Sequence, residues 1–245
     1  MKDGSILVFD SGIGGLTVLS ELTKLLKKEH FIYFGDNGNA PYGSKDTEEL
    51  KKIITGNCKL FKSYRPKALV CACNTLSADF LPLIESETGV KTFGVFPPVF
   101  NVKGKTLLIA TERTCKKYEG ITGLDLAPMK YLAKDIENNV FDKSRIDLKT
   151  HFAESKGDFH REKGYYDAVI LGCTHYLFLK SEIIDHFCPK QWLSGGRSTA
   201  KAVASFLKAS KSLGNYKQFS VNFIGDHAEH NRKVYEKVFE NIPNL

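Results

Sequence analysis

The chain has 245 residues, of which 42% are hydrophobic and 26% charged, a composition that is ordinary for a globular protein and excludes wholesale disorder. Its length accommodates one large domain or two small ones. The formal net charge is +7, but the lysines occur as scattered pairs, which are typical of solvated helix faces. We therefore expect no nucleic-acid partner.

No apolar run approaches the roughly 18 residues that a membrane helix needs, and the N-terminal segment lacks a signal-peptide core. We therefore expect a cytoplasmic protein without a membrane partner. Its six cysteines are then expected to be reduced thiols, since disulfides are rare in that compartment. The pair Cys71 and Cys73 is weak evidence for zinc, and no spacing of a zinc site occurs, so we expect no metal.

Short apolar runs alternate with amphipathic stretches along the chain. The runs predict buried strands at 6–9, 31–34, 68–72, 107–110, 168–171 and 221–224. Helical spacing predicts helices over 16–28, 46–64, 199–212 and 228–240, the second opened by Asp46 and Glu49, which are placed as in a capping box. Buried strands separated by helices indicate a parallel α/β fold.

An internal repeat with an offset of 100 residues relates two pairs of these strands. Ala68–Thr75 aligns with Ala168–His175, and Leu7–Ser11 aligns with Leu107–Thr111. The repeat predicts two similar doubly wound parallel-sheet domains, related by a pseudo-dyad and enclosing a cleft. We place crossovers near Phe96–Pro98 and Gly214–Asn215, so the first domain comprises residues 1–97 plus 214–245 and the second comprises 98–213.

Polar segments follow four of the predicted strands. Ligands bind at the carboxyl ends of strands in open α/β sheets, and the helix N-termini that follow favour anions. The sequence therefore predicts a site for a small carboxylate ligand formed by Asp10–Gly12, Cys73–Thr75, Thr111–Thr114 and Cys173–His175.

Two of the six cysteines differ from the others. Cys73 and Cys173 end equivalent strands, whereas the remaining four are interpreted as packing residues: Cys58, Cys71, Cys115 and Cys188. Two thiols that face one cleft are what inversion at a carbon centre needs, since one removes a proton and the other delivers one to the opposite face. Asp10 and His175 could each accept a thiol proton, although a helix-capping Asp and a packing His remain alternatives.

A glycine-rich turn after the first strand offers a competing interpretation. Gly12, Gly14 and Gly15 partly match a dinucleotide fingerprint, which would indicate a nucleotide-dependent oxidoreductase. The third fingerprint position is Thr17 rather than glycine, and Asp10 would repel a pyrophosphate. The match is therefore weak.

Several of these segments together resemble the glutamate racemases of the cofactor-independent aspartate/glutamate racemase superfamily. The resemblance spans nearly the whole chain and is carried by Phe9–Leu16, Gly35–Gly43, Ala72–Thr75, Ile109–Thr111 and Leu171–His175. It implies interconversion of L- and D-glutamate, without cofactor or metal, to supply D-glutamate for peptidoglycan. It also implies a homodimer with the active site between the two domains of each chain.

The resemblance further implies roles for individual residues. Cys73 would take the α-proton of D-glutamate with help from Asp10, and Cys173 that of L-glutamate with help from His175. Glu137 is similar to the auxiliary acidic residue of the family, by a looser match. The implied substrate contacts are Asp10, Ser11, Pro41, Tyr42, Gly43, Asn74, Thr75, Thr111, Thr114 and Thr174.

Two positions depart from the family pattern. Leu177 stands where the family typically has proline, and Trp192–Gly196 replaces an Asp-Ser-Gly-type segment. We expect these departures to affect regulation, interface geometry or rate rather than the type of reaction. Two alternatives stay open: a racemase for another acidic amino acid such as aspartate, and a non-catalytic amino-acid-binding protein on the same scaffold.

Overall fold

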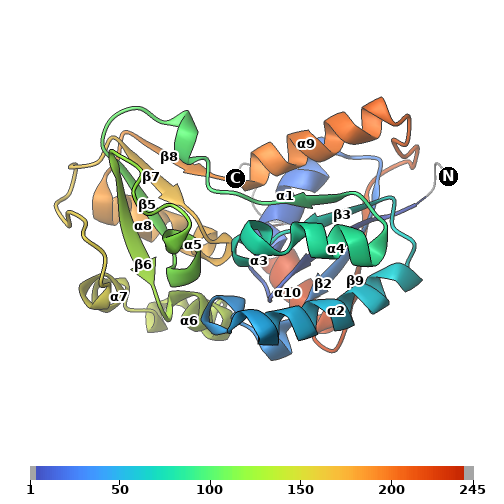
Figure 1. The fold of residues 1–245 in the computed structure, drawn as a ribbon, viewed down its shortest axis with the longest axis horizontal. Helices are drawn as coiled ribbons and strands as arrows, with labels where there is room; N and C mark the ends of the chain where they lie inside the picture. The colour runs from blue at the N-terminus through green and yellow to red at the C-terminus, as the bar shows by residue number, and fades with distance from the viewer. Residues whose placement is uncertain (1–3, 240–245) are drawn as a thin grey trace.

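A computed structural model describes residues 4–239 as two lobes, each built on a parallel sheet with packed helices (Figure 1). The five-stranded sheet of the first lobe has the order β4-β3-β1-β2-β9, and the four-stranded sheet of the second has the order β6-β5-β7-β8. The elements that build the first lobe are β1 (Ile6–Asp10), α1 (Leu16–Leu25), β2 (His30–Gly35), α2 (Thr47–Ser63), β3 (Ala68–Cys71), α3 (Asn74–Asp79), α4 (Leu81–Thr88), β4 (Thr92–Gly94), β9 (Ser220–Ile224) and α10 (Ala228–Phe239). The second lobe contains β5 (Thr106–Thr111), α5 (Glu112–Lys116), β6 (Leu124–Met129), α6 (Leu132–Asn139), α7 (Leu148–Glu154), β7 (Ala168–Leu171), α8 (Lys180–Phe187) and β8 (Gln191–Ser194).

The two sheets are built alike. The order β4-β3-β1-β2 in one matches β8-β7-β5-β6 in the other. The register agrees as well, since Ile6 pairs with Ala68 in the first sheet and Thr106 pairs with Ala168 in the second. The structure thus confirms the predicted α/β fold with two similar parallel sheets, and the repeat offset of 100 residues holds at the level of strand pairing.

Strands buried on both faces explain the continuous apolar runs of the sequence. Along β1, Ile6 and Val8 face a core that includes α1 and α10, whereas Leu7 and Phe9 face a second core under α2, α3 and α4. The first of these cores continues into the second lobe, where Leu107 and Ile109 of β5 join it. The lobes are therefore joined by a shared apolar core.

All six predicted strands and all four predicted helices are present, with ends shifted by a few residues. Asp46 caps α2, accepting a hydrogen bond from the Glu49 backbone N–H at 2.8 Å. Three strands at the sheet edges were not predicted: β4, β6 and β8. The predicted end of the last helix, Glu240, lies outside the described residues. One cysteine interpretation is wrong: Cys188 is exposed, at the C-terminal end of α8, and is not a packing residue.

Helix α9 (Gly196–Ala209) belongs by its packing to the first lobe. It lies against α1 (Figure 1), and the Thr199 hydroxyl donates to the Gly94 carbonyl of β4 at 3.0 Å. The predicted second domain, residues 98–213, includes this helix. The domain boundaries stay predictions, and the packing favours a second crossover near Gly195.

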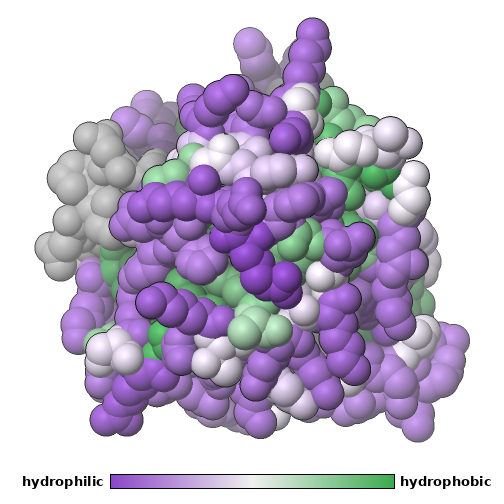
Figure 2. Space-filling view, turned by 90° about the vertical axis from the view of Figure 1, so that its left-hand side faces the viewer, coloured by the Kyte–Doolittle hydropathy of each residue, from purple (hydrophilic) through white to green (hydrophobic). Residues whose placement is uncertain are grey.

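The outer face of the second lobe is dominated by hydrophilic side chains, with apolar ones scattered among them (Figure 2). Within residues 4–239, none of the helices is both long enough and apolar enough to cross a membrane.

Candidate active site

Most of the predicted site residues line one small cavity between the lobes, which we call the interlobe cavity. Its volume is about 20 Å³, enough for about one water molecule and too small for an amino acid. Its lining residues are Asp10, Ser11, Pro41, Tyr42, Gly43, Cys73, Asn74, Thr75, Thr111, Ala133, Cys173, Thr174 and His175. Of the predicted set, Thr114 and Glu137 lie just outside this lining.

The strands place these side chains. Asp10 and Thr111 end β1 and β5, and the two thiols lie just beyond β3 and β7. Cys73 occupies the N-cap position of α3, and Cys173 that of the 3₁₀ helix η5 (Thr174–Leu179). Because the carboxyl ends of parallel strands share one edge of a sheet, both lobes present their loops to the same space. The equivalent registers thereby bring the two thiols to one cavity.

Asp10 is a buried carboxylate beside the first thiol. Its Oδ2 accepts a hydrogen bond from the Gly15 N–H at 2.6 Å, whereas its buried Oδ1 has no partner within residues 4–239. Burial raises the pKa of Asp10 to about 6, although the charge of His175 opposes this effect. Burial also holds the pKa of the Cys73 thiol well above its usual range, and the charge of Asp10 adds to the shift. The Cys73 side of the cavity therefore favours a protonated thiol.

The second thiol has a different environment. His175 Nδ1 lies 3.9 Å from Cys173 Sγ, and His175 Nε2 lies 2.7 Å from Glu137 Oε2. Burial alone would lower the pKa of His175, but its hydrogen bonds to Cys173 and Glu137 outweigh burial and hold that pKa well above its usual range. The Cys173 side of the cavity therefore has a charged imidazole next to the thiol, held from behind by Glu137.

Glu137 is held in place by the first lobe, although it comes from α6 of the second. The Ile13 N–H donates to Glu137 Oε2 at 3.1 Å, and the Asn37 amide donates to Oε1. Burial would raise the pKa of Glu137, yet the His175 hydrogen bond and charge together with these donors hold it below its usual value. The carboxylate is therefore ionised and lies against the imidazole.

The glycine-rich turn has a packing role instead of a nucleotide-binding one. A Cβ at Gly12 would collide with the Glu137 carboxylate, one at Gly14 with the His175 ring, and one at Gly15 with the Asp10 side chain. These glycines therefore allow the first lobe to approach the His175 segment closely.

Hydroxyl and amide groups complete the wall of the cavity. The Thr75 and Thr111 hydroxyls lie 3.3 Å apart, and Thr111 Oγ1 donates to Thr114 Oγ1 at 3.1 Å. Thr114 thus orients Thr111 from behind. The peptide bond before Pro41 is cis, and the buried Tyr42 hydroxyl donates to the carboxylate of Asp36.

Sequence reasoning missed three polar residues that support this site. Asp36 holds the Tyr42 hydroxyl, Asn37 holds Glu137, and Asn231 of α10 donates to Asn37 Oδ1 at 2.9 Å. Asp36 and Asn37 lie inside the motif Gly35–Gly43, so their position there was a signal that could have identified them. Asn231 carried no such signal, because only the fold brings it to the loop.

No protein-family model matches the chain. A glutamate racemase of Thermus thermophilus is 35% identical over 222 residues, which cover 87% of this chain and 84% of the relative. Another from Clostridium novyi is 35% identical over 190 residues, covering 71% and 72%. The chain belongs to the glutamate racemase family. Among solved structures, a Thermus thermophilus glutamate racemase in complex with beta-chloro-D-alanine matches with a TM-score of 0.75 at 30% identity, covering 98% of this chain and 95% of that one.

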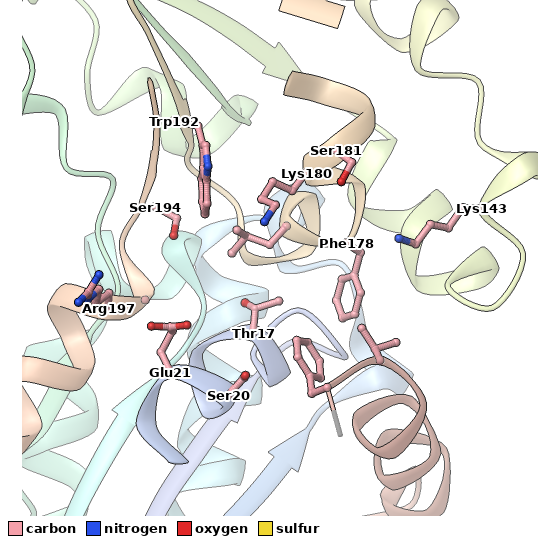
Figure 3. Close-up of a pocket in the computed structure, with 14 residues that line it drawn as sticks. Thr17, Ser20, Glu21, Lys143, Phe178, Lys180, Ser181, Trp192, Ser194 and Arg197 are labelled. Carbon is pink, nitrogen blue, oxygen red and sulfur yellow. The ribbon is translucent and has the colours of Figure 1, made fainter. Parts of the chain in front are cut away.

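The two departures from the glutamate racemase pattern lie together in the structure. Leu177 and the segment Trp192–Gly196 both line a second cavity of about 460 Å³. Figure 3 shows Trp192 and Lys180 on one side of it, and Thr17, Ser20 and Glu21 of α1 on the other. Its wall includes η5, the helix that begins next to Cys173. The departures thus adjoin the segment that carries the second thiol, outside the interlobe cavity.

Proposed function

We propose that the protein interconverts L- and D-glutamate by moving the α-proton between the thiols of Cys73 and Cys173, without a metal or an organic cofactor. The observation that carries this proposal is that two thiols from topologically equivalent strand ends line one cavity. Membership of the glutamate racemase family supports the choice of glutamate.

The surroundings of the thiols support separate roles for them. Cys173, beside the imidazole held by Glu137, takes the α-proton of L-glutamate, and Cys73 delivers a proton to the opposite face. In the reverse direction Cys73 takes the α-proton of D-glutamate and Asp10 accepts the proton that the thiol must lose. The unpartnered Oδ1 of Asp10 is suited to that task.

The remaining lining residues hold the substrate. Backbone N–H groups and the side chains of Asn74, Thr75, Thr111 and Thr174 donate hydrogen bonds to the two carboxylates and leave Cα between the thiols.

The product D-glutamate supplies peptidoglycan synthesis in the cytoplasm, and the working unit is a homodimer. Analytical ultracentrifugation of the purified protein tests the last point.

The two-thiol mechanism is tested by racemisation of L-glutamate in deuterated water. Early in the reaction the product should carry α-deuterium while the remaining L-glutamate stays unlabelled, because the group that delivers the proton differs from the one that removes it. Equal labelling of substrate and product would indicate a single base and contradict the mechanism.

Cysteine variants identify the two groups. Cys73→Ala and Cys173→Ala should each lower the racemisation rate by about 10²–10⁴-fold, the range for loss of a general acid or base. Cys58→Ala, which removes a buried thiol outside the cavity, is the matched control and should retain activity. Full activity of the double Cys73→Ala, Cys173→Ala variant would exclude the proposal. The same assay with aspartate decides between acidic substrates.

A further inference from the structure

A set of contacts between the lobes borders a space, open to solvent, next to the interlobe cavity. This outer cavity has a volume of about 510 Å³ and is lined by Gly43, Ser44, Lys45, Asp46, Asp79, Glu112, Arg113, Lys116 and Lys117. It shares Gly43 with the interlobe cavity, so the two spaces adjoin there. The first five residues belong to the first lobe and the last four to α5 and its C-terminal end.

Arg113 reaches from α5 across the outer cavity to three groups of the first lobe. Its Nε donates to Asp79 Oδ2 at 3.2 Å, its Nη2 to Thr47 Oγ1 at 2.9 Å, and its Nη1 to the Lys45 carbonyl at 3.5 Å. Lys117 pairs with the other oxygen of Asp79. The Arg113 and Asp79 side chains are only 21% and 19% exposed, so water and salt screen this pair less than an ordinary surface pair.

The elements joined by Arg113 also carry the walls of the interlobe cavity. Helix α3 has Asn74 and Thr75 in its first turn and Asp79 at its end, and α5 follows directly on Thr111. The two helices lie against each other (Figure 1). Gly43 packs so closely on Thr111 that a Cβ there would lie 3.0 Å from Thr111 Cγ2. Separating α3 from α5 therefore opens the cavity wall.

The interlobe cavity must open before an amino acid can enter it, because its present volume of about 20 Å³ accommodates only about one water molecule. We propose that Arg113 and Asp79 form a latch between α5 and α3 that controls entry of substrate and release of product. The identity of the substrate that the latch admits rests on the proposed function. Opening of the interlobe cavity can be measured without any turnover of substrate.

The test uses iodoacetamide as a probe of opening, with modification of each cysteine followed by peptide mass spectrometry. Cys73 and Cys173 line the closed cavity, Cys188 is exposed, and the remaining three are buried elsewhere. In Arg113→Gln and in Asp79→Asn, we expect Cys73 and Cys173 to react roughly five- to tenfold faster than in the parent protein, as the loss of charged hydrogen bonds predicts. The rate at Cys188 should not change.

A matched control separates the latch from general loss of charge. Arg145 pairs with Asp142 at 3.0 Å on the surface of the second lobe, and Arg145→Gln should leave all rates unchanged. The double variant Arg113→Gln, Asp79→Asn should react at least as fast as the faster single variant, because Lys117 still pairs with Asp79 in the first single variant and Arg113 still bonds Thr47 in the second. Unchanged rates at Cys73 and Cys173 in the single variants would overturn the latch. An equal rise at Cys58, Cys71 and Cys115 would show general loosening and would also overturn it.

Steady-state kinetics give a second readout. The single variants should raise KM for glutamate and leave kcat equal or higher, because closure holds the substrate and opening releases the product. A lower kcat at unchanged KM would place Arg113 in the proton-transfer machinery and overturn the latch. Absence of racemase activity in the parent protein would refute the proposed function, while the alkylation rates would still decide whether Arg113 and Asp79 control opening.

Discussion

The two thiols of the interlobe cavity have unlike partners. Cys173 lies beside an imidazole that Glu137 holds, whereas Cys73 lies near the carboxylate of Asp10, of which one oxygen has no partner among residues 4–239. Burial and the charge of Asp10 keep the pKa of Cys73 high, while hydrogen bonds to Cys173 and Glu137 keep the pKa of His175 high in spite of burial. Each thiol therefore lies beside a different titratable group.

Removing the charge of Glu137 tests the Cys173 side. In Glu137→Gln the imidazole loses the carboxylate that raises the pKa of His175, so a smaller fraction of His175 is protonated at alkaline pH. We expect kcat to fall by roughly ten- to hundredfold, less than for loss of a general base itself. The loss should be larger at pH 9 than at pH 6, which a pH–rate profile measures.

A second histidine–carboxylate pair, between Asp135 of α6 and His151 of α7, provides the control. Asp135 Oδ2 lies 2.9 Å from His151 Nε2, and this pair lies outside the interlobe cavity. Asp135→Asn should therefore leave the pH–rate profile unchanged. A uniform loss of activity across all pH values in Glu137→Gln would contradict the assigned electrostatic role.

Asp10 should destabilise the folded protein at neutral pH. Its pKa is raised from 3.8 to about 6, so the folded state binds this proton more tightly than the unfolded state. The stability that the protonated form provides is complete below about pH 4 and is lost as the pH rises through 6. At about 1.4 kcal/mol per pH unit, the ionised carboxylate costs up to about 3 kcal/mol above pH 7.

The variant Asp10→Asn removes this titration and can still accept from the Gly15 N–H. Its free energy of unfolding in urea should exceed that of the parent protein at pH 8 by up to about 3 kcal/mol, with little difference at pH 4. A constant difference between the two proteins from pH 4 to pH 8 would contradict the raised pKa.

At the scale of elements, a buried ion pair joins three segments of the first lobe. Lys67 Nζ lies 2.6 Å from Glu29 Oε2 and donates to the Ser212 carbonyl at 2.8 Å, and the Gly214 N–H donates to Glu29 Oε1 at 2.6 Å. The side chains of Lys67 and Glu29 are 7% and 2% exposed. This pair therefore ties the segment after α9 to the starts of β2 and β3.

Breaking the pair should be costly, because it leaves a carboxylate buried without a counter-charge. We expect Lys67→Met to lower the free energy of unfolding by about 3–5 kcal/mol, as measured by urea denaturation. Lys91→Met, which breaks the exposed pair with Glu85 in the same lobe, should cost less than about 1 kcal/mol. Equal losses in the two variants would show that burial of the Lys67 pair is unimportant.

The strands that are buried on both faces of a sheet could be predicted from the sequence. The six strands recognised as apolar runs include all the central ones and one edge strand, β9, whereas β6 contains Asp125 and Pro128 and β8 is half exposed. Edge strands contact the core on fewer sides, so their sequences need no continuous apolar run. Strand β4 has only three residues, too few for a pattern.

Local sequence also predicted only part of the candidate site. Cys73 and Cys173 follow predicted strands, so their positions at the sheet edges could be inferred from local sequence. The partners Asn37, Asn231 and Arg113 act across segments that are distant in the chain. No local pattern records such contacts, because they arise only when distant segments of the chain pack together, within the first lobe for Asn37 and Asn231 and between the lobes for Arg113 and Asp79.

At the scale of the whole molecule, the positive charge should assist arrival of a doubly acidic substrate. The net charge is +7, and the outer cavity has four basic and three acidic residues in its lining. We expect kcat/KM for glutamate to fall by roughly two- to fivefold as NaCl rises from about 20 to about 300 mM, because salt screens long-range attraction.

Two lysine variants test whether the charge near the outer cavity causes the salt dependence of kcat/KM. Lys116→Gln, in the lining of the outer cavity, should reduce the dependence of kcat/KM on salt, whereas Lys201→Gln, an exposed lysine of α9, should not. A salt dependence that is identical in both variants and in the parent protein would show that the charge near the cavity does not guide the substrate.

The unlike partners of the two thiols have a thermodynamic consequence. Two enantiomers have the same free energy in water, so the equilibrium constant for their interconversion is one. The ratio kcat/KM must then be equal in the two directions, whatever groups surround each thiol. The difference between Asp10 on one side and the His175–Glu137 pair on the other can alter only how kcat and KM are divided between the directions. At saturation the protein is free to be faster with one enantiomer, and at low concentration it must treat both alike.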